Sequence, residues 1–172
     1  EVLSPQTHEV CPSGCDYSVL QDAIDAASNG DTILVSPGVY TGGPFSVAVM
    51  KTNGKQLTIQ STDGADNTII DGEGVRAGLL CDNGEPIDMV IDGFTFRNGQ
   101  AVDYDFGDGV LWNLGGGISC LSASSPSISN CVIENSNAYY GGGVYGYVSD
   151  FKLDNCIIRN NTAPGYGGGL CV

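Results

Sequence analysis

The chain has 172 residues, a length that fits one domain. Twenty acidic residues against six lysines and arginines give a formal net charge of -14, which argues against nucleic acid and anionic membranes as partners, because both favour basic surfaces. No apolar run approaches the roughly 18 residues that a membrane-spanning helix needs, so no membrane span is predicted.

The composition favours an extracellular protein. Seven cysteines in so short a chain indicate an oxidising compartment, and the CxxC spacing of a zinc site is missing. The sequence begins at Glu1 with no initiator Met and no leader, which fits a mature N-terminus left by a removed signal peptide, although a boundary set for other reasons would look the same. A secreted or cell-surface location is therefore expected.

Residues 1–15 are predicted to form an irregular lead-in, because prolines and a glycine interrupt them. Cys11 and Cys15 flank a Pro-Ser-Gly turn and are expected to form a disulfide that closes a small loop. The remaining residues, 16–172, are expected to form a single domain.

One helix is predicted at about residues 17–28. Apolar side chains recur there with helical spacing, Ser18 and Gln21 fit a capping box, and Gly30 supplies a stop signal. After Asp31 the sequence contains only short β-rich runs, broken by Gly, Asn and Asp, and the runs expected to be strands before the repeats are 32–35, 56–60, 68–70, 77–81 and 89–96.

Internal repeats dominate the second half of the chain. Gly-Gly-Gly triplets at 115–117, 141–143 and 167–169 recur every 26 residues, and residues 128–135 match residues 153–160 at an offset of 25. A constant period of this length is typical of a solenoid, and several three- to five-residue strands per period indicate a parallel β-helix whose coils stack about 4.8 Å apart. The predicted fold class is therefore all-β, a parallel β-helix with an N-terminal capping α-helix.

Aligning the coils predicts ladders of equivalent side chains. Two inward ladders are expected, one of Phe94, Cys131 and Cys156 and one of Phe96, Ile133 and Ile158. The outward positions give a charge column of Arg97, Glu134 and Arg159 and an amide ladder of Asn98, Asn135 and Asn160, and Tyr140 is expected to stack on Tyr166.

The cysteines follow the same alignment. Cys81 aligns with Cys120 and Cys131 with Cys156, so each pair is expected on adjacent coils, either as a disulfide or as two reduced thiols packed in the interior. Cys171 has no aligned partner, and Val172 falls in mid-coil. We therefore expect either further coils beyond it or axial stacking of one copy on another.

Residues 16–42, which run from Asp16-Tyr-Ser-Val-Leu-Gln to Gly-Val-Tyr-Thr-Gly42, resemble the N-terminal cap and first coil of right-handed parallel β-helix proteins of the pectin-lyase-like superfamily. The later Ser-Asn-Cys-Val-Ile-Glu-Asn and Gly-Gly-Gly repeats are similar to the polymorphic outer membrane protein-type repeats of bacterial secreted and surface proteins. The superfamily includes polysaccharide lyases and hydrolases beside non-catalytic adhesins, so the resemblance implies a fold and leaves the function open.

The best candidate site lies in residues 99–114, an insertion that separates equivalent coils by 37 residues instead of 25. Acidic and aromatic side chains in one loop could grip calcium or a sugar ring, although the same acids are also common in polar turns. The candidate ligand-binding residues are Asp103, Tyr104, Asp105, Phe106, Asp108 and Trp112, of which Asp103, Asp105 and Asp108 are the candidate calcium ligands.

No catalytic residue is predicted. The insertion holds no basic residue to act as a lyase base, and no histidine follows His8, whereas the superfamily's hydrolases use aspartates with a histidine in the central coils. The leading hypothesis is a non-catalytic structural or adhesive protein of the cell exterior, which contacts extracellular polysaccharide, a host surface or further copies of itself in fibres. The alternative is a carbohydrate-active lyase or hydrolase, or a polysaccharide-binding module.

Overall fold

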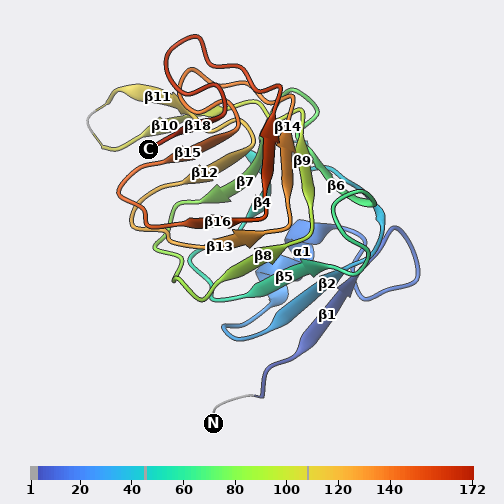
Figure 1. The fold of residues 1–172 in the computed structure, drawn as a ribbon. Coiled ribbons are helices and arrows are strands. Elements are labelled where there is room, and N and C mark those ends of the chain that lie inside the picture. Colours follow the sequence, from blue (N-terminus) through green and yellow to red (C-terminus); the bar gives the residue numbers. More distant parts are fainter. Residues whose placement is uncertain (1–3, 45, 108) are drawn as a thin grey trace.

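The computed structural model describes residues 4–44, 46–107 and 109–172, and these form the expected right-handed parallel β-helix of about six coils. Figure 1 shows the coils stacked in chain order, from blue to red, around one central interior. The first sheet contains β1 (Thr7–Val10), β2 (Thr32–Val35), β5 (Thr58–Ser61), β8 (Val90–Asp92), β13 (Ser127–Ser129) and β16 (Lys152–Asp154). The second contains β3 (Gly38–Tyr40), β6 (Thr68–Asp71), β9 (Thr95–Arg97), β14 (Val132–Glu134) and β17 (Ile157–Arg159), and the third contains β4 (Ala48–Lys51), β7 (Ala77–Cys81), β12 (Ile118–Cys120), β15 (Val144–Gly146) and β18 (Leu170–Cys171).

The strand register confirms the inward ladders. Ile133 pairs with Phe96 on one side and with Ile158 on the other, and these side chains belong to one apolar cluster that fills the interior. The stretch 89–96, expected as one strand, is divided into β8 and β9 because Gly93 takes a positive φ of 80° at the corner between two sheets. A strand pattern alone does not show such a corner.

The outward charge column has a different pairing from the expected one. Glu134 pairs with Arg159 at 2.7 Å, but Arg97 turns to the preceding coil and pairs with Asp71, also at 2.7 Å. Asp71 is better buried than Glu134 and also accepts from the Asn98 amide, so it offers Arg97 the stronger site.

The amide ladder also differs from the expectation. Asn98, Asn135 and Asn160 have φ values of 52°, 53° and 56°, so their shared property is the left-handed turn that Asn tolerates at each bend. No hydrogen bond joins their side chains in the described part of the chain. Amide contacts between coils occur at another position, where Asn155 donates to Asn130 at 2.7 Å.

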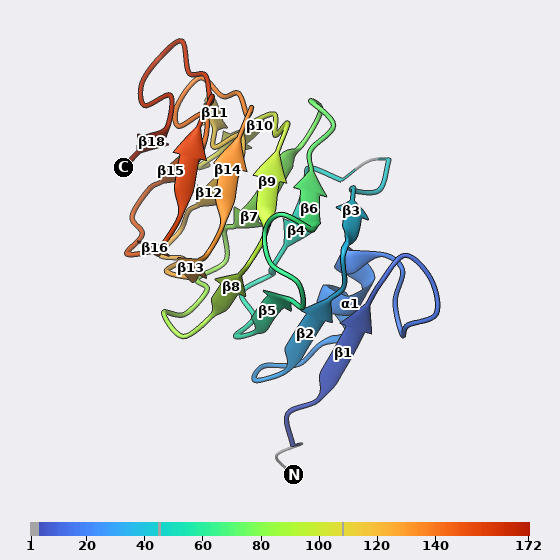
Figure 2. The ribbon, with the colours of Figure 1, turned by 45° about the vertical axis from the view of Figure 1, so that its right-hand side comes forward.

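The N-terminal lead-in is more regular than expected. Thr7–Val10 forms β1, which pairs in parallel with β2 and makes an additional coil before the helix. The four residues are mostly polar and show no apolar alternation, so only the pairing with β2 reveals the strand. Figure 2 shows β1 at the blue end of the stack, beside β2 and α1.

The helix α1 (Leu20–Ala26) is shorter than the predicted 17–28. Its N-cap is Val19, and the expected capping box is absent because the Gln21 side chain bonds the backbone of Lys51 instead. The helix packs its buried side chains, Leu20, Ala23 and Ile24, into the first end of the apolar cluster. It therefore caps the stack as expected, although β1 precedes it.

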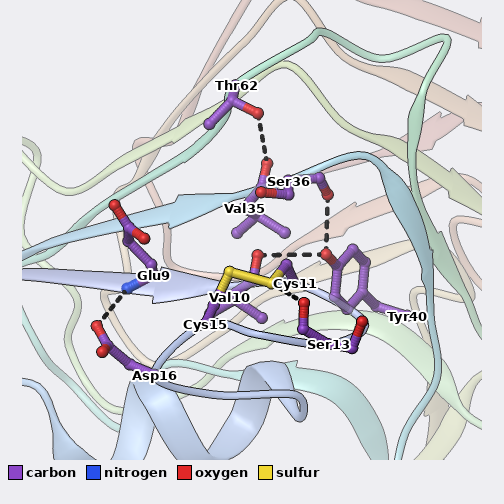
Figure 3. Close-up of a disulfide and its surroundings, with 10 residues drawn as sticks. All are labelled: Glu9, Val10, Cys11, Ser13, Cys15, Asp16, Val35, Ser36, Tyr40 and Thr62. Carbon is purple, nitrogen blue, oxygen red and sulfur yellow. Dashed lines mark hydrogen bonds between the residues drawn. A yellow bond between two sulfur atoms is a disulfide. The ribbon is translucent and has the colours of Figure 1, made fainter.

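The Cys11–Cys15 disulfide is present, at the end of β1 (Figure 3). The hydroxyl of Tyr40 donates to the carbonyl oxygens of Ser36 and Val10, at 2.8 and 3.4 Å, and so connects this segment to the next coil. The other two cysteine pairs are free thiols, so the reduced alternative holds for Cys81 with Cys120 and for Cys131 with Cys156. Cys81 and Cys120 occupy paired positions of parallel strands, where side chains point the same way, which does not favour disulfide geometry.

The lead-in is expected to loosen in acid. Asp31 accepts hydrogen bonds from the backbone N–H groups of Gln6 and Ser28 and contacts His8, and these interactions lower the pKa of Asp31 to about 2. Because this pKa lies below the unfolded value of 3.8, the contribution of Asp31 is complete above about pH 4 and is lost as the pH falls towards 2. The protection factors of the β1 amides, which compare the observed exchange with the intrinsic rate at the same pH, should therefore fall over that range. In the Asp31→Asn variant the exchange should be faster already at neutral pH and should lose this acid dependence, and equal protection in both proteins would contradict the prediction.

The insertion 99–114 is a β-hairpin outside the coils. Its strands, β10 (Val102–Asp105) and β11 (Leu111–Leu114), are antiparallel, and it lies beside β12 and β15 in Figure 1. At its base, Gln100 pairs with Asn137 and Leu114 with Tyr140 of the next coil, so the coil closes beneath it. β9 pairs directly with β14, which confirms the 37-residue offset.

No described helix is long and apolar enough to span a membrane. Axial stacking of one copy on another stays a prediction.

Candidate functional site

The two faces of the hairpin carry different side chains. Tyr104 pairs with Trp112 across the strands, and both rings are half-buried against the outer surface of the third sheet. Asp103 and Asp105 alternate with Tyr104 along β10 and are exposed. The predicted aromatic and acidic candidates are therefore on opposite faces of one hairpin.

The described acids have nearby polar partners. Asp103 accepts from the side-chain amide of Asn113 at 3.1 Å, and Asp105 accepts from the backbone N–H groups of Gly107 and Gly109 at 2.7 and 3.1 Å. Asp108 lies outside the described residues. Within 4–44, 46–107 and 109–172, no three His, Cys, Asp or Glu side chains form a group that could hold a metal ion, and calcium binding stays a prediction.

The aromatic face of the hairpin continues across the neighbouring coils. Tyr140 is central: its ring stacks on Tyr166 in the next coil at 5.8 Å and 10°, as predicted, and contacts Tyr139 at 4.8 Å, Trp112 at 6.0 Å and Tyr145 at 6.5 Å between ring centroids. Four side chains from different segments thus surround one ring. Such tilted and stacked pairs stabilise one another beyond the area that they bury.

A second group of rings extends the surface to the hairpin tip. Phe106 contacts Tyr104 and Tyr147, with 4.9 Å between centroids in each case. Tyr104 in turn pairs with Trp112, which joins the two groups. We call the whole surface the aromatic band, and it consists of Tyr104, Phe106, Trp112, Tyr139, Tyr140, Tyr145, Tyr147 and Tyr166.

Much of this surface is open to solvent. The exposed fractions of Tyr166, Tyr147, Tyr139 and Phe106 are 69, 50, 49 and 39%. Exposed rings in contact with one another form an apolar surface rather than isolated apolar residues, and such surfaces commonly bind a ligand or a partner.

A small apolar cluster supports the band from beneath. The alanines and leucines of the third sheet and the hairpin base form it, and Tyr104, Trp112, Tyr140 and Tyr145 pack onto it. Burial raises the pKa of the Tyr145 phenol above its ordinary value, which indicates how closely this ring packs onto the cluster. The backbone at Gly165 lies against the Tyr139 ring, where an added Cβ would approach a ring carbon to 2.5 Å. The rings are therefore held by packing on rigid coils.

Three of the eight aromatic residues were predicted as ligand-binding residues: Tyr104, Phe106 and Trp112. The other five are tyrosines that flank glycine triplets, where the repeat pattern suggests only stacking between coils. These tyrosines share a surface with the hairpin residues only because the hairpin folds back over β12 and β15. The sequence alone does not show the direction in which the hairpin folds. The signal that could have found them is the density of aromatic residues around 139–147.

No protein-family model matches the chain, and no curated protein matches it. Among solved structures, the chain is similar to a pectin methylesterase from Aspergillus niger, crystallised in a penultimately deglycosylated form, with a TM-score of 0.49 and 17% identity over 87% of this chain. The match spans 55% of that protein. The fold assignment given above depends on the strand register of this chain itself.

Proposed function

We propose that this protein is a non-catalytic adhesive β-helix of the cell exterior that binds an uncharged polysaccharide through the aromatic band. The observation that carries the proposal is a surface of eight aromatic side chains, which form two groups of contacting rings joined by the cross-strand pairing of Tyr104 with Trp112, with four rings substantially exposed. Flat rings pack against the apolar faces of sugar rings while hydroxyls at their edges hydrogen-bond. The Cys11–Cys15 disulfide supports an extracellular location.

The charge of the chain supports an uncharged ligand. A net charge of -14 disfavours acidic polysaccharides through long-range repulsion. Five of the six lysines and arginines are engaged with acidic side chains or with helix carbonyls, namely Lys51, Lys55, Arg76, Arg97 and Arg159. Neutral glycans need no cationic partner, and stacked aromatic rings suit them.

The alternative of a polysaccharide-cleaving enzyme has less support. Cleavage requires an acid and a base placed about one reacting bond. Asp103 and Asp105 are exposed on the hairpin face opposite the aromatic band, and neither forms an ion pair with any basic residue that the structure describes. Incubation with the bound polysaccharide should therefore release no reducing or unsaturated ends.

The single tryptophan provides a direct assay, because Trp112 lies within the aromatic band. Titration with neutral polysaccharides, such as xyloglucan, galactomannan and laminarin, should change the Trp112 emission for at least one of them, whereas polygalacturonate should not bind. Tyr139→Ala and Tyr166→Ala should each weaken the binding about fivefold, since one lost stacking contact costs about 1 kcal/mol. Both side chains are exposed, so folding should be retained.

Leu111→Ala is the matched control, because Leu111 is 65% exposed on the opposite face of the hairpin and its loss should leave affinity unchanged. A parallel titration in EDTA, which removes calcium, distinguishes binding by the aromatic band from binding by calcium on the acidic face of the hairpin. Binding that EDTA abolishes would assign the site to calcium and the predicted acids, and failure of all neutral polysaccharides to bind would refute the proposal.

A further inference from the structure

Two pairs of thiols are stacked in the coil interior in different environments. Cys120 pairs in register with Cys81, and both are fully buried at 0% exposure. Cys131 directly precedes β14 and Cys156 directly precedes β17, so the register of Val132 with Ile157 places them as neighbours on consecutive coils. Cys131 is 1% exposed, whereas Cys156 is only partly buried.

The second pair resembles an attacking thiol beside a resolving thiol. The S–H groups of Cys131 and Cys156 donate to the carbonyl oxygens of Ser129 and Asp154, at 3.0 and 3.3 Å. The interaction with the neighbouring Cys131 thiol lowers the pKa of Cys156 to about 7. The same contact, with burial, raises the pKa of Cys131. A partly accessible thiolate forms at Cys156 near neutral pH, while Cys131 stays protonated and shielded.

We propose that Cys131 and Cys156 are a reversible redox site that forms a disulfide between consecutive coils by exchange with a small-molecule disulfide such as oxidised glutathione. The Cys156 thiolate attacks one glutathione sulfur, the glutathione S–S bond breaks, and one glutathione thiolate leaves. Cys131 then loses its proton to solvent and attacks the Cys156 sulfur of the mixed disulfide, and the second glutathione leaves. The protein loses two hydrogen atoms, and one oxidised glutathione is reduced to two thiols.

The backbone geometry suits the bond. Neighbouring parallel strands lie about 4.8 Å apart, within the Cα separation that disulfides accept. The N–H of Ile157 donates to the carbonyl of Cys131 at 2.9 Å, which holds the two segments in register at this point. Both residues lie outside the strands, at equivalent positions of the corner between the first and second sheets, so the bond requires a rotation of the two side chains.

The test is reaction of the reduced, folded protein with oxidised glutathione near pH 8, followed by alkylation, tryptic digestion without reduction, and tandem mass spectrometry. Cleavage after Lys152 and Arg159 leaves Cys156 alone in a short peptide, while residues 98–152 hold both Cys120 and Cys131, so fragment ions that cut between these two cysteines assign the link. The Cys131–Cys156 link should appear first, at least tenfold faster than any link between Cys81 and Cys120. The pH dependence of Cys156 alkylation should have its midpoint near 7.

Two variants separate the roles of the thiols. Cys131→Ser should trap a stable glutathione adduct on Cys156, and Cys156→Ser should leave Cys131 unmodified while the protein is folded, with melting curves confirming the fold of each. Cys131→Ala and Cys156→Ala provide the same readouts if a buried hydroxyl impairs folding. A stable Cys156 adduct in the unsubstituted protein, or equal rates for the Cys81–Cys120 pair, would overturn the proposal.

Discussion

Replacement of Glu85 by alanine is expected to lower the free energy of unfolding by about 3–5 kcal/mol. Glu85 is completely buried, and its carboxylate accepts from the Thr52 hydroxyl at 2.7 Å, the Gly54 N–H at 2.7 Å, the Asn83 N–H at 3.1 Å and the Ser124 hydroxyl at 2.5 Å. Thr52 belongs to the preceding coil and Ser124 to the following one. One side chain therefore satisfies donors from three coils. Its removal takes the acceptor from the buried Ser124 hydroxyl and leaves the buried Thr52 hydroxyl only its 3.4 Å contacts with the Leu80 carbonyl oxygen and Cys81 Sγ.

The Glu85→Gln variant tests the charge itself. Burial raises the pKa of Glu85, but the hydrogen bonds from Ser124, Thr52 and the two backbone N–H groups outweigh it, and the net pKa lies below the unfolded value of 4.5. A lowered pKa means that the carboxylate stabilises the fold above about pH 4.5 and that this contribution disappears as the pH falls through the folded value. The difference in stability between the natural protein and Glu85→Gln should shrink correspondingly in acid.

Urea denaturation monitored by circular dichroism at neutral and acid pH measures both effects. Asp88→Ala is the control, because Asp88 is exposed and its one hydrogen bond, to Gln56, is also exposed. Its loss should cost no more than about 0.5 kcal/mol. Equal losses for Glu85→Ala and Asp88→Ala would show that the inter-coil network does not stabilise the stack.

Gly116→Ala is expected to destabilise the protein by about 3 kcal/mol or more, or to prevent folding. An added Cβ would lie 2.5 Å from the carbonyl oxygen of Asn137 and 2.7 Å from that of Gly142, both in the next coil. These are backbone atoms, which cannot rotate away as a side chain can. Relief requires the two coils to separate, and the hydrogen bonds from the N–H groups of Gly116 and Gly117 to the carbonyl oxygens of Gly141 and Gly142 depend on their present distance.

Gly43→Ala provides the comparison, since an added Cβ there meets nothing within 4 Å and the residue does not require a positive φ. Its expected effect is within about 0.5 kcal/mol of zero. Thermal melting of the two variants beside the natural protein distinguishes them. A melting temperature for Gly116→Ala that matches that of Gly43→Ala would mean that the triplets are needed only for turning.

The sequence predicts the stack well because equivalent side chains recur at a fixed offset. The pairing of Phe96 with Ile133, the Tyr140–Tyr166 stack and the insertion at 99–114 all follow from that offset. Each of these features concerns residues that face an equivalent residue one coil away. Aligning the repeats in the sequence therefore also identifies which residues contact each other in space.

Features that depend on a non-equivalent partner are not predictable in this way. The Gln21 side chain bonds the backbone of Lys51 instead of capping the helix, and Arg97 pairs with Asp71 rather than with Glu134. The polar segment β1 is a strand only because it pairs with β2. The aromatic band is another case, because its composition depends on which face of the hairpin turns to the third sheet. Alternation along β10 separates Asp103 from Tyr104, but the sequence does not show which of them packs inward.

The hairpin leaves and rejoins its coil at adjacent points, where Gln100 pairs with Asn137 and Leu114 with Tyr140. Ala101 and Asn113, just inside these bridges, still bond Asn137, Tyr139 and Tyr140 of the next coil, and the chain between Ala101 and Asn113 forms the hairpin. Substitution of this segment by another of different length and chemistry would preserve the underlying ladder. Evolution can therefore diversify recognition at this corner while the scaffold stays constant, and an engineer can graft a foreign loop at the same junction.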